Sequence, residues 1–297
     1  MTRAAALLAA LVLTVSGCGG GGDEEEASGV LKRGFATDVD TGVLTLDAEV
    51  QLEGVEWVEG PLRLELKGPF RAAGSPTEMP DLDMEFRASG LGQTYDGRVV
   101  VTRENAWVEF GGATYEVGEE LWARVIEALE RGDPNAPESL REAGIDPLDW
   151  VVDAETDADE DVGGIPATKV TASLDVERML RDFNKLVRDP DRHIPEKALG
   201  RVDDVVDDVD FETWVGEDDI WRRVSAETEF EVPEDERDSA GGLEGGRVAL
   251  DIRLDEPNEP VEIEGPAEAR SIDELLRRLG IPPELLLGPG FAAPTPG

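Results

Sequence analysis

The side chains that most often perform acid–base or nucleophilic chemistry are scarce in this chain. His193 is its only histidine, and it lies in the run Arg192-His193-Ile194-Pro195, after a predicted helix. A Ser-His-Asp hydrolase would have to use this imidazole as its base. No nucleophile elbow lies near it in the sequence. The sequence therefore argues against a hydrolase, and we expect that the protein is not an enzyme.

Carboxylates are abundant, but their spacing does not define a metal site. Asp157, Asp159 and Asp161 have the first spacings of a calcium-binding loop. The sixth and twelfth positions of such a loop need glycine and glutamate, and here they hold Val162 and Thr168. A zinc site needs several histidine or cysteine ligands, and the chain has one of each. We interpret the acidic turns as solvated surface and expect no metal or other cofactor.

The single cysteine has a more informative context. Arg3 precedes an uncharged apolar run from Ala4 to Val15, and Ser16-Gly17-Cys18 follows it. This is the layout of an export signal, because the run is too short to cross a bilayer as a helix. The tetrapeptide ending at Cys18 matches the lipobox of bacterial lipoproteins, in which the cysteine thiol becomes diacylglycerated. An ordinary cleaved signal with a chance cysteine is the alternative.

The lipobox divides the chain into four predicted parts. Residues 1–17 are a lipoprotein signal peptide, and residues 18–29 are the lipidated Cys18 with a flexible tether rich in glycine and acid. Residues 30–290 form one domain, and residues 291–297 are a disordered tail. We expect the protein at the cell membrane, held by its lipid on the extracytoplasmic face.

The composition excludes several partners. The chain has 68 acidic and 28 basic residues, a formal net charge of −40. Nucleic-acid binding needs cationic surface that displaces counterions, so we expect no nucleic-acid partner. Docking on anionic lipid through a basic patch is disfavoured for the same reason. With one cysteine, no disulfide can form within the chain, and the fold depends on burial of apolar side chains.

Most of the chain alternates between apolar and polar residues. The period of two over Leu44–Leu52 predicts a strand with one buried face, and the same pattern returns many times. Helical spacing is confined to a few stretches, among them residues 121–129, a helix capped by Asp175, and a capping box at Ser271. Strands joined by short turns favour one large antiparallel sheet, whose apolar face needs a cover. With only 5% aromatic residues, that cover leaves either an internal apolar cavity or a core filled by helices.

Several segments, in this order, resemble the LppX/LprG/LprA/LprF lipoprotein family of actinobacteria. The resembling segments are the lipobox at Cys18, Gly60-Pro61-Leu62, Gly68-Pro69-Phe70, Ala113–Val117, Ile145-Asp146-Pro147, Glu160–Val170, Leu174-Asp175, and Trp214–Asp219 with Arg222-Arg223. The likeness runs loosely from about Gly29 to Gly280. The turn from Glu160 to Val170 is its most specific part.

This resemblance implies an α+β fold: a single strongly curved antiparallel β-sheet, or half-barrel, with helices covering the concave face. The periplasmic carriers LolA and LolB share that architecture. It also implies a hydrophobic cavity that holds acyl chains, and members that move acylated lipids or glycolipids through the envelope, some with a membrane lipid exporter. The chain departs from the family in its acidity and in the long loop Pro233–Gly246.

We therefore predict a membrane-anchored carrier that shields the acyl chains of a lipid or glycolipid from water, acting as a monomer. The alternative is a surface lipoprotein with a filled core and no lipid ligand that binds another protein or senses the envelope. The helix Val176–Val187 is expected to act as a lid. The expected lining is the inward-facing set Leu44, Leu46, Val50, Leu64, Leu66, Met84, Phe86, Val108, Phe110, Met179, Phe183, Phe211, Val224, Phe230, Leu250 and Ile252.

The anchor can be tested directly. Replacing Cys18 by serine removes the thiol that carries the lipid, so we expect the protein to move from the membrane fraction to the soluble fraction. Metabolic labelling with a palmitate analogue should be lost in the same variant. Firm membrane attachment of the Cys18→Ser protein would overturn the anchor assignment.

Overall fold

The computed structural model describes residues 22–55, 58, 60–74, 78–131, 144–186, 193–206, 208–238 and 240–280. The predicted signal peptide, Cys18 and the tail from residue 291 lie outside these ranges. In the described part of the chain, no helix combines the length and apolar character needed to cross a membrane.

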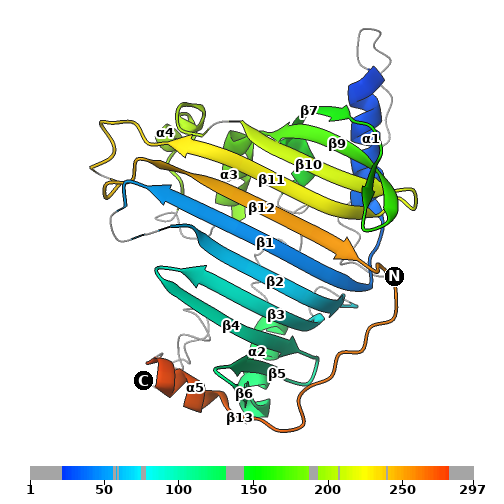
Figure 1. The fold of residues 1–297 in the computed structure, drawn as a ribbon, viewed down its shortest axis with the longest axis vertical. Helices are drawn as coiled ribbons and strands as arrows, with labels where there is room; N and C mark the ends of the chain where they lie inside the picture. Colours follow the sequence, from blue (N-terminus) through cyan, green and yellow to red (C-terminus); the bar gives the residue numbers. More distant parts are fainter. Residues whose placement is uncertain are drawn as a thin grey trace.

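The described strands form one open sheet of 13 strands, shown in Figure 1. The order across the sheet is β13-β6-β5-β4-β3-β2-β1-β12-β11-β10-β9-β7, with β8 paired to β9. All neighbours are antiparallel except β13 and β6. The bounds are β1 Thr41–Glu53, β2 Leu62–Arg71, β3 Asp81–Gly90, β4 Gln93–Val101, β5 Ala106–Phe110, β6 Ala113–Glu116, β7 Val151–Thr156, β8 Glu160–Val162, β9 Ile165–Leu174, β10 Val209–Gly216, β11 Trp221–Glu231, β12 Gly245–Asp255 and β13 Arg270–Ser271. The predicted α+β class, with one antiparallel sheet in an open half-barrel, is confirmed.

The strand register gives the sheet two chemically different faces. Leu46 of β1 lies opposite Leu66 of β2 on one side and Ile252 of β12 on the other. The next position, Asp47, lies between Glu65 and Asp251. Because side chains alternate along a strand, most apolar positions fall on the side of Leu46, with exceptions such as Val43 and Val100 on the other side. We call this side the apolar face and the side of Asp47 the polar face.

The helices are α1 Gly22–Ala36, α2 Glu119–Arg131, α3 Val176–Leu186, α4 Glu196–Leu199 and α5 Ile272–Leu279, with short 3-10 turns η2 Pro147–Trp150 and η4 Val202–Asp204. Their predicted caps are present: the Asp175 carboxylate accepts from the Arg178 amide at 2.8 Å, and the Ser271 hydroxyl accepts from the Asp273 amide at 3.3 Å. Figure 1 views the sheet with α2 and α3 behind it, on the side of the apolar face.

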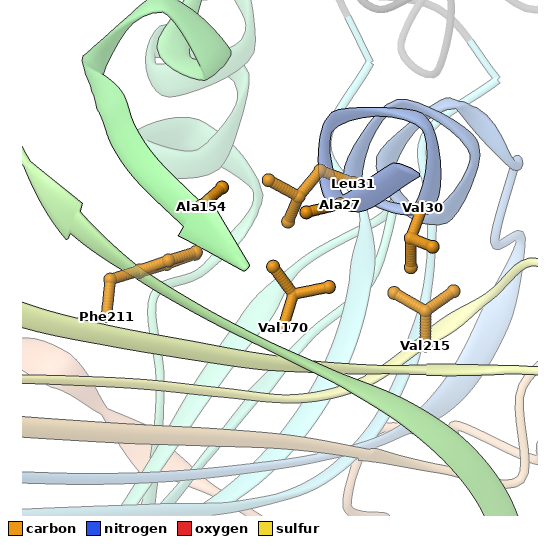
Figure 2. Packing of buried hydrophobic residues seen from close by; sticks show 7 residues of the cluster. All are labelled: Ala27, Val30, Leu31, Ala154, Val170, Phe211 and Val215. Atoms are coloured by element: carbon orange, nitrogen blue, oxygen red, sulfur yellow. The ribbon is translucent and has the colours of Figure 1, made fainter. Parts of the chain in front are cut away.

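Three buried clusters hold the helices against the apolar face, all near its two ends. At one end α1 packs on β7, β9 and β10 (Figure 2), through Ala27, Val30, Leu31, Ala154, Val170, Phe211 and Val215. At the other end α2 packs through Trp122 on Val101 and Ala106, and α5 packs through Leu275 and Leu276 on Tyr115. Burial of these side chains stabilises both ends of the sheet through the hydrophobic effect.

The start of α1 corrects one expectation. Residues 22–29, which the sequence assigned to a flexible tether, form the first half of this helix. Ala27 is fully buried against the sheet, so the helix is fixed by tertiary packing that composition alone does not reveal. The helix therefore leaves a shorter connection to Cys18 than the sequence indicated.

The burial of α1 makes a testable claim about stability. Leu31 is 3% exposed, and its replacement by alanine leaves a cavity between α1 and the sheet. We expect the free energy of unfolding to fall by about 2–5 kcal/mol, measured by urea denaturation. Leu279→Ala is the matched control, since Leu279 is 47% exposed and its loss should change stability by about 0.5 kcal/mol or less. Equal effects of the two changes would contradict the packing of α1.

Candidate functional site

The middle of the apolar face lies between its two helix-covered ends. Ten of the predicted lining residues are there, on β1, β2, β3, β11 and β12, and we call them the central strip: Leu44, Leu46, Val50, Leu64, Leu66, Met84, Phe86, Phe230, Leu250 and Ile252. None of the ten is buried, and none belongs to a buried cluster of the described residues. Leu64 is 38% exposed. The central strip is therefore apolar surface that described helices leave partly open.

Glycines flatten this strip. Gly97 lies opposite Phe86, and a Cβ added to the glycine would meet the phenyl ring at 2.5 Å. Gly246 lies opposite Phe230 in the same way, with the ring 2.9 Å from an added Cβ. The rings thus lie over glycine backbone, where any side chain would displace them. The result is a low apolar surface with few projections, suited to an extended hydrocarbon chain.

The remaining predicted lining residues have other surroundings. Val108 and Phe110 pack against α5, and Phe211 and Val224 belong to the cluster under α1. These four side chains contribute to the helix-packed core rather than to the open strip. Conversely, the alternation also places Leu62, Phe70 and Val248 on the apolar face, although they were not among the predicted lining residues. The period of two was a sufficient signal to find them.

The predicted lid helix α3 is held to η2 by an ion pair between Arg178 and Asp149 at 2.5 Å and by the contacts of Phe183 and Asp182. Phe183 is 47% exposed and stacks on Trp150, with ring centroids 6.2 Å apart. The Trp150 indole donates to the Asp182 carboxylate at 2.7 Å, and Lys185 also donates to that carboxylate. Met179 is half-buried. The aromatic side of α3 therefore faces η2, which orients the helix beside the sheet.

Asp182 is the charged centre of this contact. Burial by itself raises its pKa, but the hydrogen bonds from Lys185 and Trp150 favour the carboxylate and together lower the pKa below the usual aspartate value. A lowered carboxylate pKa stabilises the folded state at neutral pH, and this stabilisation is lost as the pH falls through the folded-state pKa. The contact between α3 and η2 is thus weakened by acid.

The polar face carries charges rather than a hydrophobic cavity. A hollow of about 580 Å³ lies over it, among side chains such as Asp47, Lys67 and Arg87. Ion pairs stabilise its walls, including a bidentate pair in which the Arg98 guanidinium donates to the two carboxylate oxygens of Asp83 at 2.5 and 2.6 Å. Burial of an acyl chain among such groups would strip them of water without replacing their hydrogen bonds. This side of the sheet is suited to contact with solvent.

Two of the segments that carry the family resemblance meet near the polar face. The Trp214 indole is 2% exposed and donates to Glu160 of β8 at 2.9 Å. Arg223 and Lys169 lie 4.5 and 5.2 Å from its ring centroid. Arg222 is 4% exposed, and its Nη2 donates to Asp218 at 2.5 Å. These contacts tie the β8–β9 hairpin to β10 and β11, which gives the two motifs a structural role.

The residues considered for catalysis and metal binding either form hydrogen bonds within a turn or lie at the exposed surface. His193 is exposed in the segment before α4. Asp159 accepts from the Thr168 hydroxyl at 3.1 Å, and Asp161 accepts from the Gly164 amide at 2.8 Å, so both carboxylates shape the hairpin turn. Within the described ranges, no group of three or more His, Cys, Asp or Glu side chains is arranged to hold a metal ion.

No protein-family model matches the chain, and no curated protein sequence matches it. Among solved structures, the chain is similar to the lipoprotein LppX of Mycobacterium tuberculosis, at 11% identity over 81% of this chain and 100% of that one, with a TM-score of 0.39. It is also similar to LprF of Mycobacterium bovis, at 14% identity over 83% of this chain and 99% of LprF, with a TM-score of 0.41. A LolA superfamily protein from Nitrosomonas europaea is similar at 7% identity. The match covers 79% of this chain and 94% of that protein, with a TM-score of 0.22.

The acid sensitivity of α3 can be measured by comparing Asp182→Asn with the unchanged protein. At pH 7 we expect the variant to lose about 1.5–3 kcal/mol, the contribution of hydrogen bonds to a charged group. Because the lowered pKa contributes nothing once Asp182 is protonated, the difference should shrink progressively below about pH 5. Urea denaturation across this pH range measures it. A difference that is constant with pH would contradict the role given to the carboxylate.

Proposed function

We propose that this protein is a membrane-anchored lipoprotein that binds an acylated lipid or glycolipid on the central strip and carries it within the cell envelope. The observation that supports this most directly is the strip itself. Ten apolar side chains on neighbouring strands form one surface that belongs to no buried cluster of the described residues. Soluble monomers seldom expose a contiguous apolar patch of this kind unless it binds something.

The affinity comes from burial without chemistry. Apolar surface removed from water contributes roughly 25 cal/mol per Å². Acyl chains laid along Leu46, Leu66 and Phe86 would remove both their own surface and that of the strip. No bond is made or broken, so the protein acts as a carrier and not as an enzyme. The low relief over Gly97 and Gly246 suits a flexible chain better than a shaped, polar ligand.

The proposed location follows from the lipobox. A diacylglycerated Cys18 would hold the protein on the extracytoplasmic face, since two or more chains anchor far more firmly than one. Such an anchor keeps the strip close to a membrane from which lipid can be taken. The resemblance of the sequence motifs to the LppX/LprG/LprA/LprF family supports the same assignment, and it includes cooperation with a membrane lipid exporter.

The first test is native mass spectrometry with organic extraction. The protein would be expressed in an actinobacterial host from Gly19 onward, so that α1 is retained and the anchor is absent. We expect a co-purifying acylated lipid at one equivalent or more per chain. A clean apo mass that persists after incubation with total host lipid would favour the alternative, a lipoprotein that binds another protein or senses the envelope.

Charging the strip provides the matched mutational test. Leu64→Glu with Phe86→Glu places two carboxylates among the apolar side chains, where burial against acyl chains is costly, so lipid pickup should be lost. The control is Gln51→Glu with Thr94→Glu, which adds the same charge at exposed positions on the polar face. Circular dichroism should show that both proteins fold. Unchanged pickup by the folded Leu64/Phe86 variant would show that the strip is not the lipid site.

A further inference from the structure

A separate apolar hollow lies at the end of the sheet where β11 ends and β10 begins. Its volume is about 440 Å³, within the range of small-molecule sites. Leu180 of α3 forms one wall, Ile194 forms a second, and Val202, Val205 and Val206 form the floor around η4. We call this hollow the end pocket. Its walls come from segments that are distant along the chain, and aliphatic side chains predominate among them.

The end pocket adjoins the central strip. Val206 forms a β-bridge with Phe230, the strip residue at the far end of β11. The Glu231 amide, next along that strand, donates to the Val205 carbonyl at 2.8 Å. Two residues of the pocket are thus fixed by backbone hydrogen-bond geometry beside the last aromatic side chain of the strip. A chain that lies along the strip and passes Phe230 would reach the end pocket next.

The rim of the end pocket is polar and holds one cationic and two acidic side chains. The Arg201 guanidinium donates to the Glu236 carboxylate, which belongs to the loop between β11 and β12. Their side chains are 33% and 41% exposed, so the pair lies at the boundary with water. Asp204 lies 3.8 Å from Arg201 on the other side. A cation already shared by two carboxylates offers little to an anionic head group, so an uncharged hydrocarbon is the better occupant.

We propose that the end pocket holds the terminal part of one hydrocarbon chain of the lipid whose remainder lies on the central strip. This inference rests on the proposed function and adds to it a physical basis for chain-length selection. Short chains are accommodated by the strip alone. Long chains gain further burial by entering between Leu180 and Val205, beneath the Arg201–Glu236 pair.

The test is a binding series with uncharged saturated monoacylglycerols, from about 8 to about 18 carbons, measured by displacement of a fluorescent probe. Each added methylene that is buried should tighten binding by about fourfold. Val205→Trp fills the pocket. We therefore expect the affinity of this variant to stop rising with chain length several carbons earlier than that of the unchanged protein. For the longest chains, the variant should bind at least tenfold more weakly than the unchanged protein. Binding of the shortest chains should be unchanged. Val152→Trp, at an exposed position on β7, is the control.

The outcomes separate this inference from the proposed function. If the folded Val205→Trp protein has the same chain-length profile as the unchanged protein, the end pocket does not bind the hydrocarbon chain. The proposed role of the central strip would be unaffected by that result. Absence of binding at every length by the unchanged protein would overturn both. If the tryptophan prevents folding, Val206→Leu is a smaller filling of the same space, and it should show the same early plateau with a smaller loss.

Discussion

The pairing of β1 with β12 is the constraint on which the rest of the structure depends. Strands β1 to β6 form one block in sequence order, and β7 to β12 form another. Only the ladder from Val43↔Asp255 to Glu53↔Gly245 joins the two blocks into one sheet. It aligns Leu44, Leu46 and Ala48 with Leu254, Ile252 and Leu250, so the apolar faces of both blocks become continuous. The central strip exists because this long-range ladder is in register.

The two faces of that sheet are stabilised in different ways. On the apolar face, helices cover the ends, and the buried clusters around Leu31, Trp122 and Leu275 are at those ends. On the polar face, cross-strand ion pairs such as Arg63–Glu49 and Arg98–Asp83 arrange an acidic surface. The more exposed pairs of this face, such as Arg87–Asp96 at 59% and 60% exposure, contribute little to stability and mainly keep the face solvated. Core formation at the ends leaves the middle of the apolar face available.

The contrast between the helix-covered ends and the open middle of the apolar face connects the fold to the proposed carrier role. Helices pack on both ends of the sheet, while the strip between them offers a smooth apolar surface. The end pocket extends that surface past Phe230, and the α3–η2 contact through Asp182 orients the helix that forms its wall. The motifs that resemble the lipoprotein family lie partly elsewhere, around Trp214, where they hold a hairpin to the sheet. In the proposed carrier, the motif residues around Trp214 would support the sheet, and the central strip would contact the lipid.

The sequence by itself determined the strands, their faces and the helix caps, because each depends on neighbours within a few positions. The alternation from Leu44 to Leu52 defines a face, and Asp175 and Ser271 mark helix starts, whatever the rest of the chain does. Only the tertiary structure decided which apolar residues became core. Tyr115 and Leu66 both lie on the apolar face, yet α5 buries the first to 3% exposure while the second stays half-buried. The reason is physical: periodicity shows which way a side chain points, whereas burial depends on which distant element packs against it.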